Sequence, residues 1–198
     1  MKIILASNST YRNELMGKLG LEFNCIKPEI NEEELKYALL QSKLSPVAVA
    51  EALSYEKGNS IFKHQDKNTL VISGDQLVSF ENQILGKPLT QTNAILQLNL
   101  LNNKSHKLIT AITVFSESEI VKHNHISTLK MKNLTQTEIK NYIHKDNPLD
   151  CSGSYKIEKN GITLFESIEC NDFTAIQGIP MLWLSNYLKG AGFELFKN

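Results

Sequence analysis

The chain opens with an apolar run that leads directly into small hydroxyl residues, Ile3-Ile4-Leu5-Ala6-Ser7-Asn8-Ser9-Thr10-Tyr11-Arg12. The apolar part predicts a buried strand over 3–6, and Ser9 is a suitable N-cap for a helix that ends near Gly20. A strand that turns into a helix in this way presents free backbone N–H groups at the helix N-terminus, where an anion is stabilised. The alternative interpretation is an ordinary serine cap beside an exposed arginine.

Arg12 is the single arginine among the 21 basic residues of the chain. A guanidinium offers a planar fork of donors that fits phosphate or carboxylate in a bidentate manner, whereas lysine offers a point charge. A chain that uses lysine everywhere else and keeps arginine here indicates that this position needs the guanidinium itself. We therefore expect Arg12 to hold an anion at the start of the first helix.

The length of 198 residues and an apolar fraction of 41% fit a single α/β domain, which we assign to residues 1–198. The formal net charge is zero, so the composition provides no basic surface for nucleic acid or an anionic membrane. Three cysteines without a C-x-x-C pair argue against a disulfide framework or a zinc site and suit a reducing cytosol. No apolar run is long enough for a signal peptide or a membrane helix, so we expect a cytoplasmic protein.

Strands and helices alternate in the first half of the chain and long strands dominate its middle, which predicts an α/β fold with a mixed sheet. The early elements are a strand over 22–26, an acidic loop over 31–34, a helix over 45–62 and a strand over 70–73. The later elements are a hairpin over 77–84 that turns at 81–82, a helix over 90–101, strands over 107–115 and 120–131, a helix from a capping box at 135–138, a strand over 162–168 and a final helix from Pro180.

Asp75 lies in the segment Ser73-Gly74-Asp75-Gln76, directly after a predicted buried strand. Proteins of the α/β class place working groups at the carboxyl ends of their strands. An exposed aspartate has a pKa of about 3.9 and is a weak base at neutral pH. It becomes useful when it orients a water molecule or holds a divalent cation that acidifies the water. The alternative is a turn residue that starts the hairpin.

Three further side chains are weak candidates when each is considered alone. Lys87 lies between Gly86 and Pro88, where a rigid turn would present its ammonium group to a phosphate. Lys57, late in the predicted helix over 45–62, has the same capacity. Glu32 could ligate a metal ion, whereas three consecutive glutamates usually form a solvated surface.

Taken together and in this order, these segments resemble the Maf family of nucleoside triphosphate pyrophosphatases. The matching motifs are Ile4-Leu5-Ala6-Ser7-x-Ser9-x-x-Arg12, Pro28-Glu29-Ile30-Asn31-Glu32, Glu56-Lys57, Ser73-Gly74-Asp75-Gln76, Leu85-Gly86-Lys87-Pro88-Leu89-Thr90 and Gly178-Ile179-Pro180. They cover nearly the whole chain, and the ordered set is specific although each motif is modest alone. Asn31 stands where the family usually has aspartate.

Within the family the chain looks most like the branch that acts on 7-methyl-GTP. Gln76 and Glu158 stand where the branch acting on dTTP and UTP typically has threonine and glutamine, and the run over 161–166 also resembles the 7-methyl-GTP branch. Guanine presents N1–H and an exocyclic amine as paired donors, and a carboxylate can accept from both. Methylation at N7 makes the purine cationic, which favours a carboxylate and an aromatic face such as that of Tyr11.

The resemblance implies a Maf/ITPase-like α/β fold, with an elongated mixed β-sheet flanked by helices in two lobes and a cleft between them. It implies cleavage between the α- and β-phosphates, which converts 7-methyl-GTP to 7-methyl-GMP and diphosphate and removes a modified nucleotide from the pool. It also implies a divalent cation, Mg²⁺ or Mn²⁺. The family is commonly dimeric, which leaves a homodimer open for this chain, with a small nucleotide as its partner and no nucleic acid or membrane.

Residue roles follow from the same resemblance. Asp75 is the expected proton acceptor for the attacking water, and Glu32 and Asp75 are the expected metal ligands. The residues expected to face the phosphates are Ser7, Ser9, Arg12, Lys57 and Lys87. The residues at the specificity positions are Tyr11, Gln76 and Glu158.

Two other functions stay open from the sequence. One keeps the chemistry and changes the substrate to dTTP and UTP or to a broader nucleotide set. The other is a non-catalytic regulator of cell division, because the family has been associated with arrest of septum formation. A pure binding protein would not need an intact aspartate with a phosphate-facing set, so the sequence favours the enzyme.

Overall fold

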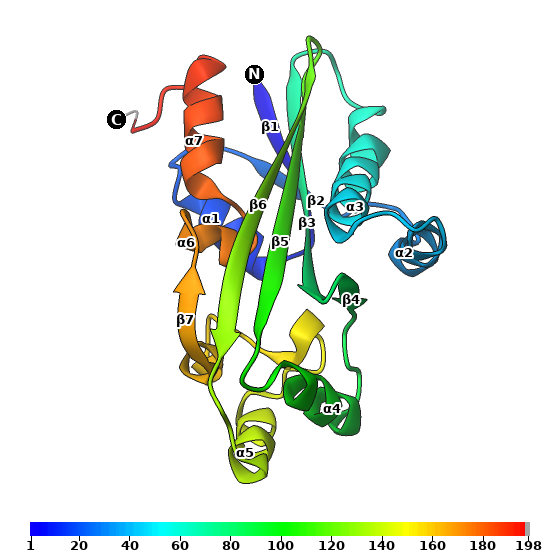
Figure 1. Ribbon diagram of the computed structural model, residues 1–198. Helices are drawn as coiled ribbons and strands as arrows, with labels where there is room; N and C mark the ends of the chain where they lie inside the picture. The colour runs from blue at the N-terminus through cyan, green and yellow to red at the C-terminus, as the bar shows by residue number, and fades with distance from the viewer. Residues whose placement is uncertain (197–198) are drawn as a thin grey trace. The chain divides into compact units, whose positions relative to one another are not determined.

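The computed structural model describes residues 1–196, in which seven strands form one sheet in the order β2-β1-β3-β5-β6-β7, with β4 paired to β3 (Figure 1). The chain divides into two compact units. The first contains residues 1–76, 110–125 and the segment from 172 onward, and the second contains residues 77–109 and 126–171. The α/β class with a mixed sheet, predicted from the sequence, is confirmed.

In the first unit, β1 (Lys2–Ala6) is the central strand of a parallel set. It pairs with β2 (Asn24–Ile26) on one side, where Leu5 lies opposite Cys25. It pairs with the start of β3 (Thr69–Phe80) on the other side, where Leu5 lies opposite Ile72. Parallel neighbours require crossover connections, and helices supply them. The helices of this unit are α1 (Thr10–Gly17), α2 (Glu32–Gln41), α3 (Pro46–Phe62), α6 (Phe173–Ile176) and α7 (Met181–Gly190).

Helices of the first unit cover both faces of its strands. Figure 1 shows α1 and α7 on one side of β1 and α3 on the other. Alternate residues of a strand point to opposite faces, so Ile72 packs with Leu15 and Leu184 on the α1 and α7 side. Val71 packs with Ile61 on the α3 side. The two faces therefore have separate cores.

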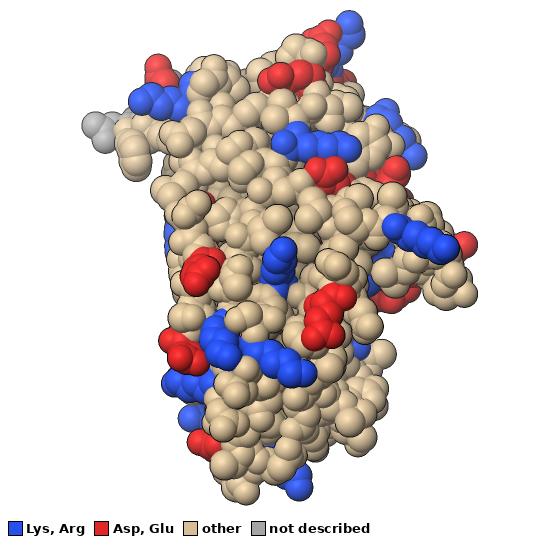
Figure 2. Space-filling model, in the orientation of Figure 1, with Lys and Arg blue, Asp and Glu red and all other residues tan. Residues whose placement is uncertain are grey.

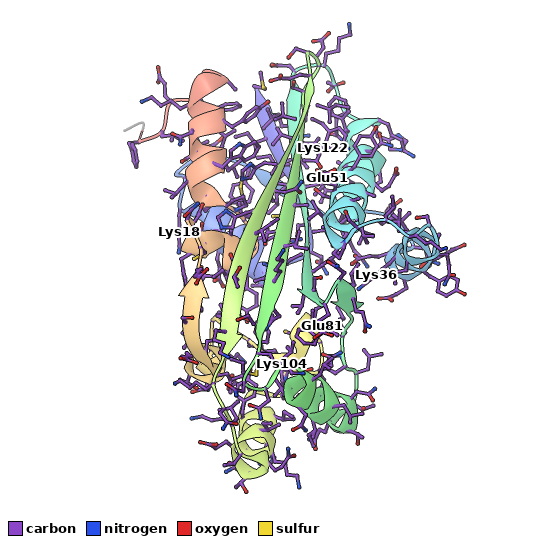
Figure 3. The ribbon with its side chains drawn as sticks, in the orientation of Figure 1. Lys18, Lys36, Glu51, Glu81, Lys104 and Lys122 are labelled. Carbon is purple, nitrogen blue, oxygen red and sulfur yellow. The ribbon has the colours of Figure 1, made fainter. Side chains whose placement is uncertain are left out.

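Two long strands, β5 (Ser105–Phe115) and β6 (Ile120–Met131), contribute to both units. In the first unit, polar contacts join one face of β6 to α3. Asn124 donates a hydrogen bond to Glu51, and the ammonium of Lys122 lies 5.2 Å from the ring centroid of Tyr55 (Figure 3). On the opposite side, the His123 and Trp183 rings stack at 4.5 Å.

The second unit is built on antiparallel pairs. β4 (Gln83–Leu85) pairs with the end of β3, and β7 (Phe165–Glu169) pairs with β6. Its helices are α4 (Gln91–Leu101) and α5 (Gln136–Asp146), with short 3₁₀ segments at Ser152–Ser154 and Asn160–Leu164. Thr90 caps α4, and Thr135 with Glu138 forms the predicted capping box of α5. The β3–β4 hairpin turns at Glu81 and Asn82, which both have positive φ, as predicted.

Three local predictions were wrong. The acidic segment over 31–34 is not a loop, because the Asn31 side chain caps α2 and three glutamates in its first turn favour the positive end of the helix dipole. The strand predicted over 70–73 does not end there: β3 continues through Gly74, Asp75 and Gln76 to Phe80. The strand predicted over 162–168 begins only at Phe165, after the 3₁₀ segment.

His106 is a buried titratable side chain in the second unit. It is 3% exposed, its Nε2 lies 3.0 Å from the Tyr155 hydroxyl, and its Nδ1 has no partner within residues 1–196. Burial lowers the pKa of His106 from 6.5 to about 4. Between these two pH values the unfolded chain binds a proton at His106 that the folded state does not bind. The free energy of unfolding therefore decreases as the pH falls from about 6.5 toward 4.

We expect the free energy of unfolding to fall by about 2 kcal/mol between pH 7 and pH 5 through this histidine. A His106→Phe variant should be less stable at pH 7, because the Tyr155 hydroxyl loses its partner, but its pH dependence should be flatter. Urea unfolding at the two pH values measures both effects. The exposed His144→Gln variant is the control and should keep the wild-type slope. An unchanged slope in His106→Phe would contradict the prediction.

Candidate functional site

The strand β3 presents consecutive residues of the predicted Ser73-Gly74-Asp75-Gln76 motif to opposite faces of the sheet. Ser73 and Asp75 face α3, since they bond Ser54 and Lys57 of that helix. Gly74 and Gln76 face the other side, where they contact Arg12 and Ala175 respectively. The motif therefore serves two different environments within the first unit.

Lys57 joins the two carboxylates that the sequence predicts as metal ligands. Its Nζ lies 2.6 Å from Asp75 Oδ1 and 2.9 Å from Glu32 Oε2. The side chains of Lys57 and Asp75 are 10% and 6% exposed, while that of Glu32, in the first turn of α2, is 45% exposed. The structure thus brings Glu32, Lys57 and Asp75 together, with Lys57 as the counter-ion of both acids.

Asp75 has the electrostatic character of a general base. One carboxylate oxygen accepts the hydrogen bond from Lys57, while Oδ2 is buried and has no partner among the described residues. Burial raises the pKa of Asp75 above its usual value, and the charges of Lys57 and Arg12 oppose that rise. A carboxylate with a raised pKa is a stronger base, because its affinity for a proton is closer to what proton abstraction at neutral pH requires.

A layer of buried hydroxyl groups lies between α3 and the strands behind Asp75. Ser73 Oγ donates to the Ser54 carbonyl at 2.7 Å, and the Ser54 and Thr113 hydroxyls lie 2.9 Å apart. Neither Ser54 nor Thr113 was recognisable from the sequence, because a single hydroxyl residue in a helix or strand carries no pattern. These bonds hold the backbone of β3 beside α3.

Gly58 allows α3 to lie this close to the sheet. A Cβ atom at this position would be 2.1 Å from the Phe115 ring and 2.5 Å from the Ser73 hydroxyl. Any side chain would force α3 away from β3, and Lys57 is the adjacent residue on that helix. The glycine is therefore a structural requirement for the Lys57–Asp75 pair.

Arg12 lies on the opposite face of β3 and bonds two carbonyl groups. Its Nη1 donates to the Gly74 carbonyl at 2.8 Å, and its Nε donates to the Gly178 carbonyl at 3.1 Å. Gly178 has φ +120°, and a Cβ there would lie 3.2 Å from Arg12 Nε. Burial lowers the pKa of Arg12, and the nearby charges of Asp75 and Glu32 oppose this effect. Arg12 is therefore not the exposed arginine of the alternative interpretation.

The hydroxyl residues at the start of α1 make the expected local bonds. Ser9 is the N-cap, and its Oγ accepts from the Arg12 amide at 3.4 Å. Ser7 is 7% exposed and its Oγ accepts from the Ser9 amide at 3.1 Å. Tyr11, in the first turn, keeps 36% of its surface exposed. The cap is confirmed, and anion binding at these residues stays a prediction.

Gln76 is held by its amide nitrogen. Nε2 donates to Thr110 Oγ1, the Ala175 carbonyl and the Ile176 carbonyl at distances of 2.9, 2.9 and 3.0 Å. Thr110 on β5 and the carbonyls of α6 were not among the residues that the sequence indicated. No short motif links three segments so far apart in the chain.

The carboxylates of Glu32 and Asp75 are suitable ligands for a hard divalent cation. Magnesium is commonly bound by one or two carboxylates, with the phosphates of a substrate completing its coordination. Within residues 1–196 no group of three or more His, Cys, Asp or Glu side chains could hold a metal by itself. A cation that also uses substrate oxygens therefore fits these residues, and the unpartnered Asp75 Oδ2 offers a free acceptor.

The second unit carries the other two predicted residues. Lys87 is exposed and lies between β4 and α4, in a segment without regular secondary structure. Glu158 is half-buried in the turn over 157–159.

Charged residues of both signs are interspersed on the face shown in Figure 2, without a continuous basic area.

A comparison with solved structures first defines the fold class. The chain aligns with the Ham1 protein of Staphylococcus aureus with a TM-score of 0.50 over 96% of this chain and 100% of that one. The two sequences are only 14% identical, so the likeness concerns the α/β fold alone.

The sequence comparisons identify the family. The Maf-like protein family matches residues 2–191, and the chain belongs to it. A Bdellovibrio bacteriovorus protein named 7-methyl-GTP pyrophosphatase is 45% identical over 96% of this chain and 97% of its own length. Relatives of the same name from Xanthomonas axonopodis pv. citri and Colwellia psychrerythraea are each 34% identical over 98% of this chain and over 98% and 94% of their own. The family predicted from the motifs is confirmed, and these relatives carry the name of the predicted branch.

We expect Arg12→Lys to lower both stability and activity. A lysine keeps the charge but cannot donate to the Gly74 and Gly178 carbonyls from one planar group, so the variant should lose about 1 to 3 kcal/mol of unfolding free energy. Thermal unfolding and steady-state kinetics measure the two effects. Wild-type stability together with wild-type kinetics in Arg12→Lys would show that the fork is not needed.

Proposed function

We propose that this protein is a nucleoside triphosphate pyrophosphatase that hydrolyses 7-methyl-GTP to 7-methyl-GMP and diphosphate. The observation that carries the proposal is the buried Asp75 carboxylate, held by Lys57 at 2.6 Å with its second oxygen unpartnered in the described part of the chain. Relatives over nearly the full length of the chain carry the name 7-methyl-GTP pyrophosphatase. The chemistry of the site and these names support the same reaction.

In the proposed reaction Asp75 accepts a proton from a water molecule as the water oxygen attacks the α-phosphorus of the nucleotide. The phosphoanhydride bond between the α- and β-phosphates breaks, and its electron pair leaves with the diphosphate. The raised pKa of Asp75 favours this proton transfer, while Lys57 keeps the carboxylate oriented. The proton is released to solvent when Asp75 returns to its ionised form.

The substrate triphosphate needs positive charge from the protein and from a cation. Arg12, Lys57 and the amide groups at the start of α1 are the donors that we assign to the phosphates, with Ser7, Ser9 and Lys87 from the family resemblance. Glu32 and Asp75 would hold Mg²⁺ or Mn²⁺, which neutralises phosphate charge and lowers the pKa of water when it is bound. Lys57 would then share both carboxylates with the cation.

Base recognition is assigned to Tyr11, Gln76 and Glu158. The exposed ring of Tyr11 offers an aromatic surface for a cationic methylated purine. A carboxylate at Glu158 suits the paired donors of guanine. These roles rest on the family resemblance and on the chemistry of the base.

Location and assembly follow from the sequence as proposals. No helix among residues 1–196 is long and apolar enough to cross a membrane. We assign the protein to the cytoplasm because its three cysteines are dispersed and form no C-x-x-C pair. A homodimer stays open, and we assign neither a nucleic acid nor a membrane as a partner.

A nucleotide panel tests the substrate. With Mg²⁺ or Mn²⁺ present, the purified protein should release diphosphate from 7-methyl-GTP with a higher kcat/KM than from GTP, dTTP or UTP, because the base residues match a methylated guanine. Diphosphate detection and identification of the nucleoside monophosphate measure the outcome. A preference for dTTP or UTP would assign the chain to the other branch. Absence of diphosphate release from every nucleotide would refute the enzymatic function.

Asp75→Asn tests the base. The substitution keeps the shape and a hydrogen-bond acceptor for Lys57 but removes proton affinity, so kcat should fall by roughly 100- to 10,000-fold. Glu32 still pairs with Lys57 in this variant, and circular dichroism should show a folded protein. The exposed Asp66→Asn variant is the matched control and should keep wild-type kcat. Substantial turnover by folded Asp75→Asn protein would remove Asp75 from this role.

A further inference from the structure

The side-chain amide of Gln76 is fixed in one orientation by three acceptors. The Ala175 and Ile176 carbonyls lie 2.9 and 3.0 Å from Nε2, and Thr110 Oγ1 lies at 2.9 Å. Carbonyl oxygens accept hydrogen bonds and never donate them. A rotated amide would place its own oxygen against two carbonyl oxygens, so the observed orientation is strongly preferred.

The hydroxyl group of Thr110 is oriented by its own hydrogen bond. Its Oγ1 donates to the Ala175 carbonyl at 2.8 Å, which leaves the lone pairs of the same oxygen to accept from Gln76. Thr110 is 1% exposed and lies on the same face of the sheet as Gln76. Because the Thr110 hydroxyl donates to one group and accepts from another, the donor and acceptor of both hydrogen bonds are defined.

The consequence is that Gln76 has only its oxygen left for a ligand. Both N–H groups of Nε2 are shared among the three acceptors, while Oε1 accepts no hydrogen bond from any residue in the range 1–196. The residue itself is half-buried, so part of it remains accessible. A side-chain amide can bond either a donor or an acceptor of a ligand. The Gln76 amide can bond only a ligand donor, because its own N–H groups are already used.

We propose that Thr110 is a positioning residue that, together with the Ala175 and Ile176 carbonyls, holds Gln76 as a hydrogen-bond acceptor, so that the protein selects nucleotides whose base presents an N–H group at this position. The proposal rests on the proposed function and on the placement of Gln76 among the specificity residues. Guanine supplies such donors at N1 and at its exocyclic amine. A base that turns a carbonyl oxygen toward Gln76 is repelled by Oε1, and the loss is large because a polar group buried without a partner is costly.

Thr110→Val tests the positioning role. The valine has nearly the same volume but cannot accept from Nε2, so the Gln76 amide loses one of its three acceptors and is held less firmly by the Ala175 and Ile176 carbonyls that remain. The ratio of kcat/KM for 7-methyl-GTP over UTP should fall about tenfold or more, chiefly through KM for 7-methyl-GTP, because one discriminating hydrogen bond of this size is worth at least that factor. Thr110→Ser restores the hydroxyl and should restore most of the ratio.

Thr113→Val is the matched control. Thr113 lies on the same strand, is also 1% exposed and also makes a side-chain hydrogen bond, but on the α3 side of the sheet. It should lose stability without a change in base ranking. If Thr110→Val keeps the wild-type ranking, or if Thr113→Val changes it equally, the positioning role is overturned. If the wild-type protein hydrolyses no nucleotide, the proposed function fails and the specificity role fails with it.

Gln76→Glu gives a second measurement that does not require turnover. A carboxylate in place of the amide faces two carbonyl oxygens and can bond to them only when it is protonated, so the folded state should favour the acid form. The melting temperature of this variant, relative to the wild type, should therefore rise when the pH is lowered from 7 to 5. The same pH dependence as in wild-type protein would overturn the assigned orientation of the amide.

Discussion

The ion pair between Lys57 and Asp75 is the interaction on which the candidate site depends. Two buried charged groups are favourable only as a pair, because removing either partner leaves the other desolvated and uncompensated. The same ammonium group reaches Glu32 at 2.9 Å, so one lysine connects α3, β3 and the first turn of α2. This connection keeps two carboxylates close together without the repulsion that they would otherwise experience.

The pair also sets the chemistry available at Asp75. Burial raises the pKa of the carboxyl group, while the charge and hydrogen bond of Lys57 oppose that rise. The second oxygen is left without a partner in the described structure. A carboxylate that is oriented, partly destabilised as an anion and open on one oxygen is suited to accept a proton from water.

The strand β3 divides the site between two faces of the sheet. Asp75 faces α3, whereas the Gly74 carbonyl and Gln76 face the side of Arg12 and α6. Because neighbouring residues of a strand must point in opposite directions, the proton acceptor and the proposed base-reading amide are adjacent in sequence yet held by separate sets of contacts. Substitutions that affect selectivity on one face can therefore leave the acid–base group on the other face in place.

Local signals in the sequence determined most of the helices, their caps and the motif residues. Ser9 and Thr135 were recognisable caps because a cap bonds residues two or three positions away. The acidic segment that begins α2 was predicted as a loop. The predicted end of β3 came too early, because glycine and aspartate disfavour strands unless neighbouring strands pair with them. The partners of Lys57, Arg12 and Gln76 were decided only by the tertiary structure, since each lies in a different segment of the chain. The sequence alone determined which chemical groups are present, and packing across the sheet decided which of them are paired, buried or left free to react.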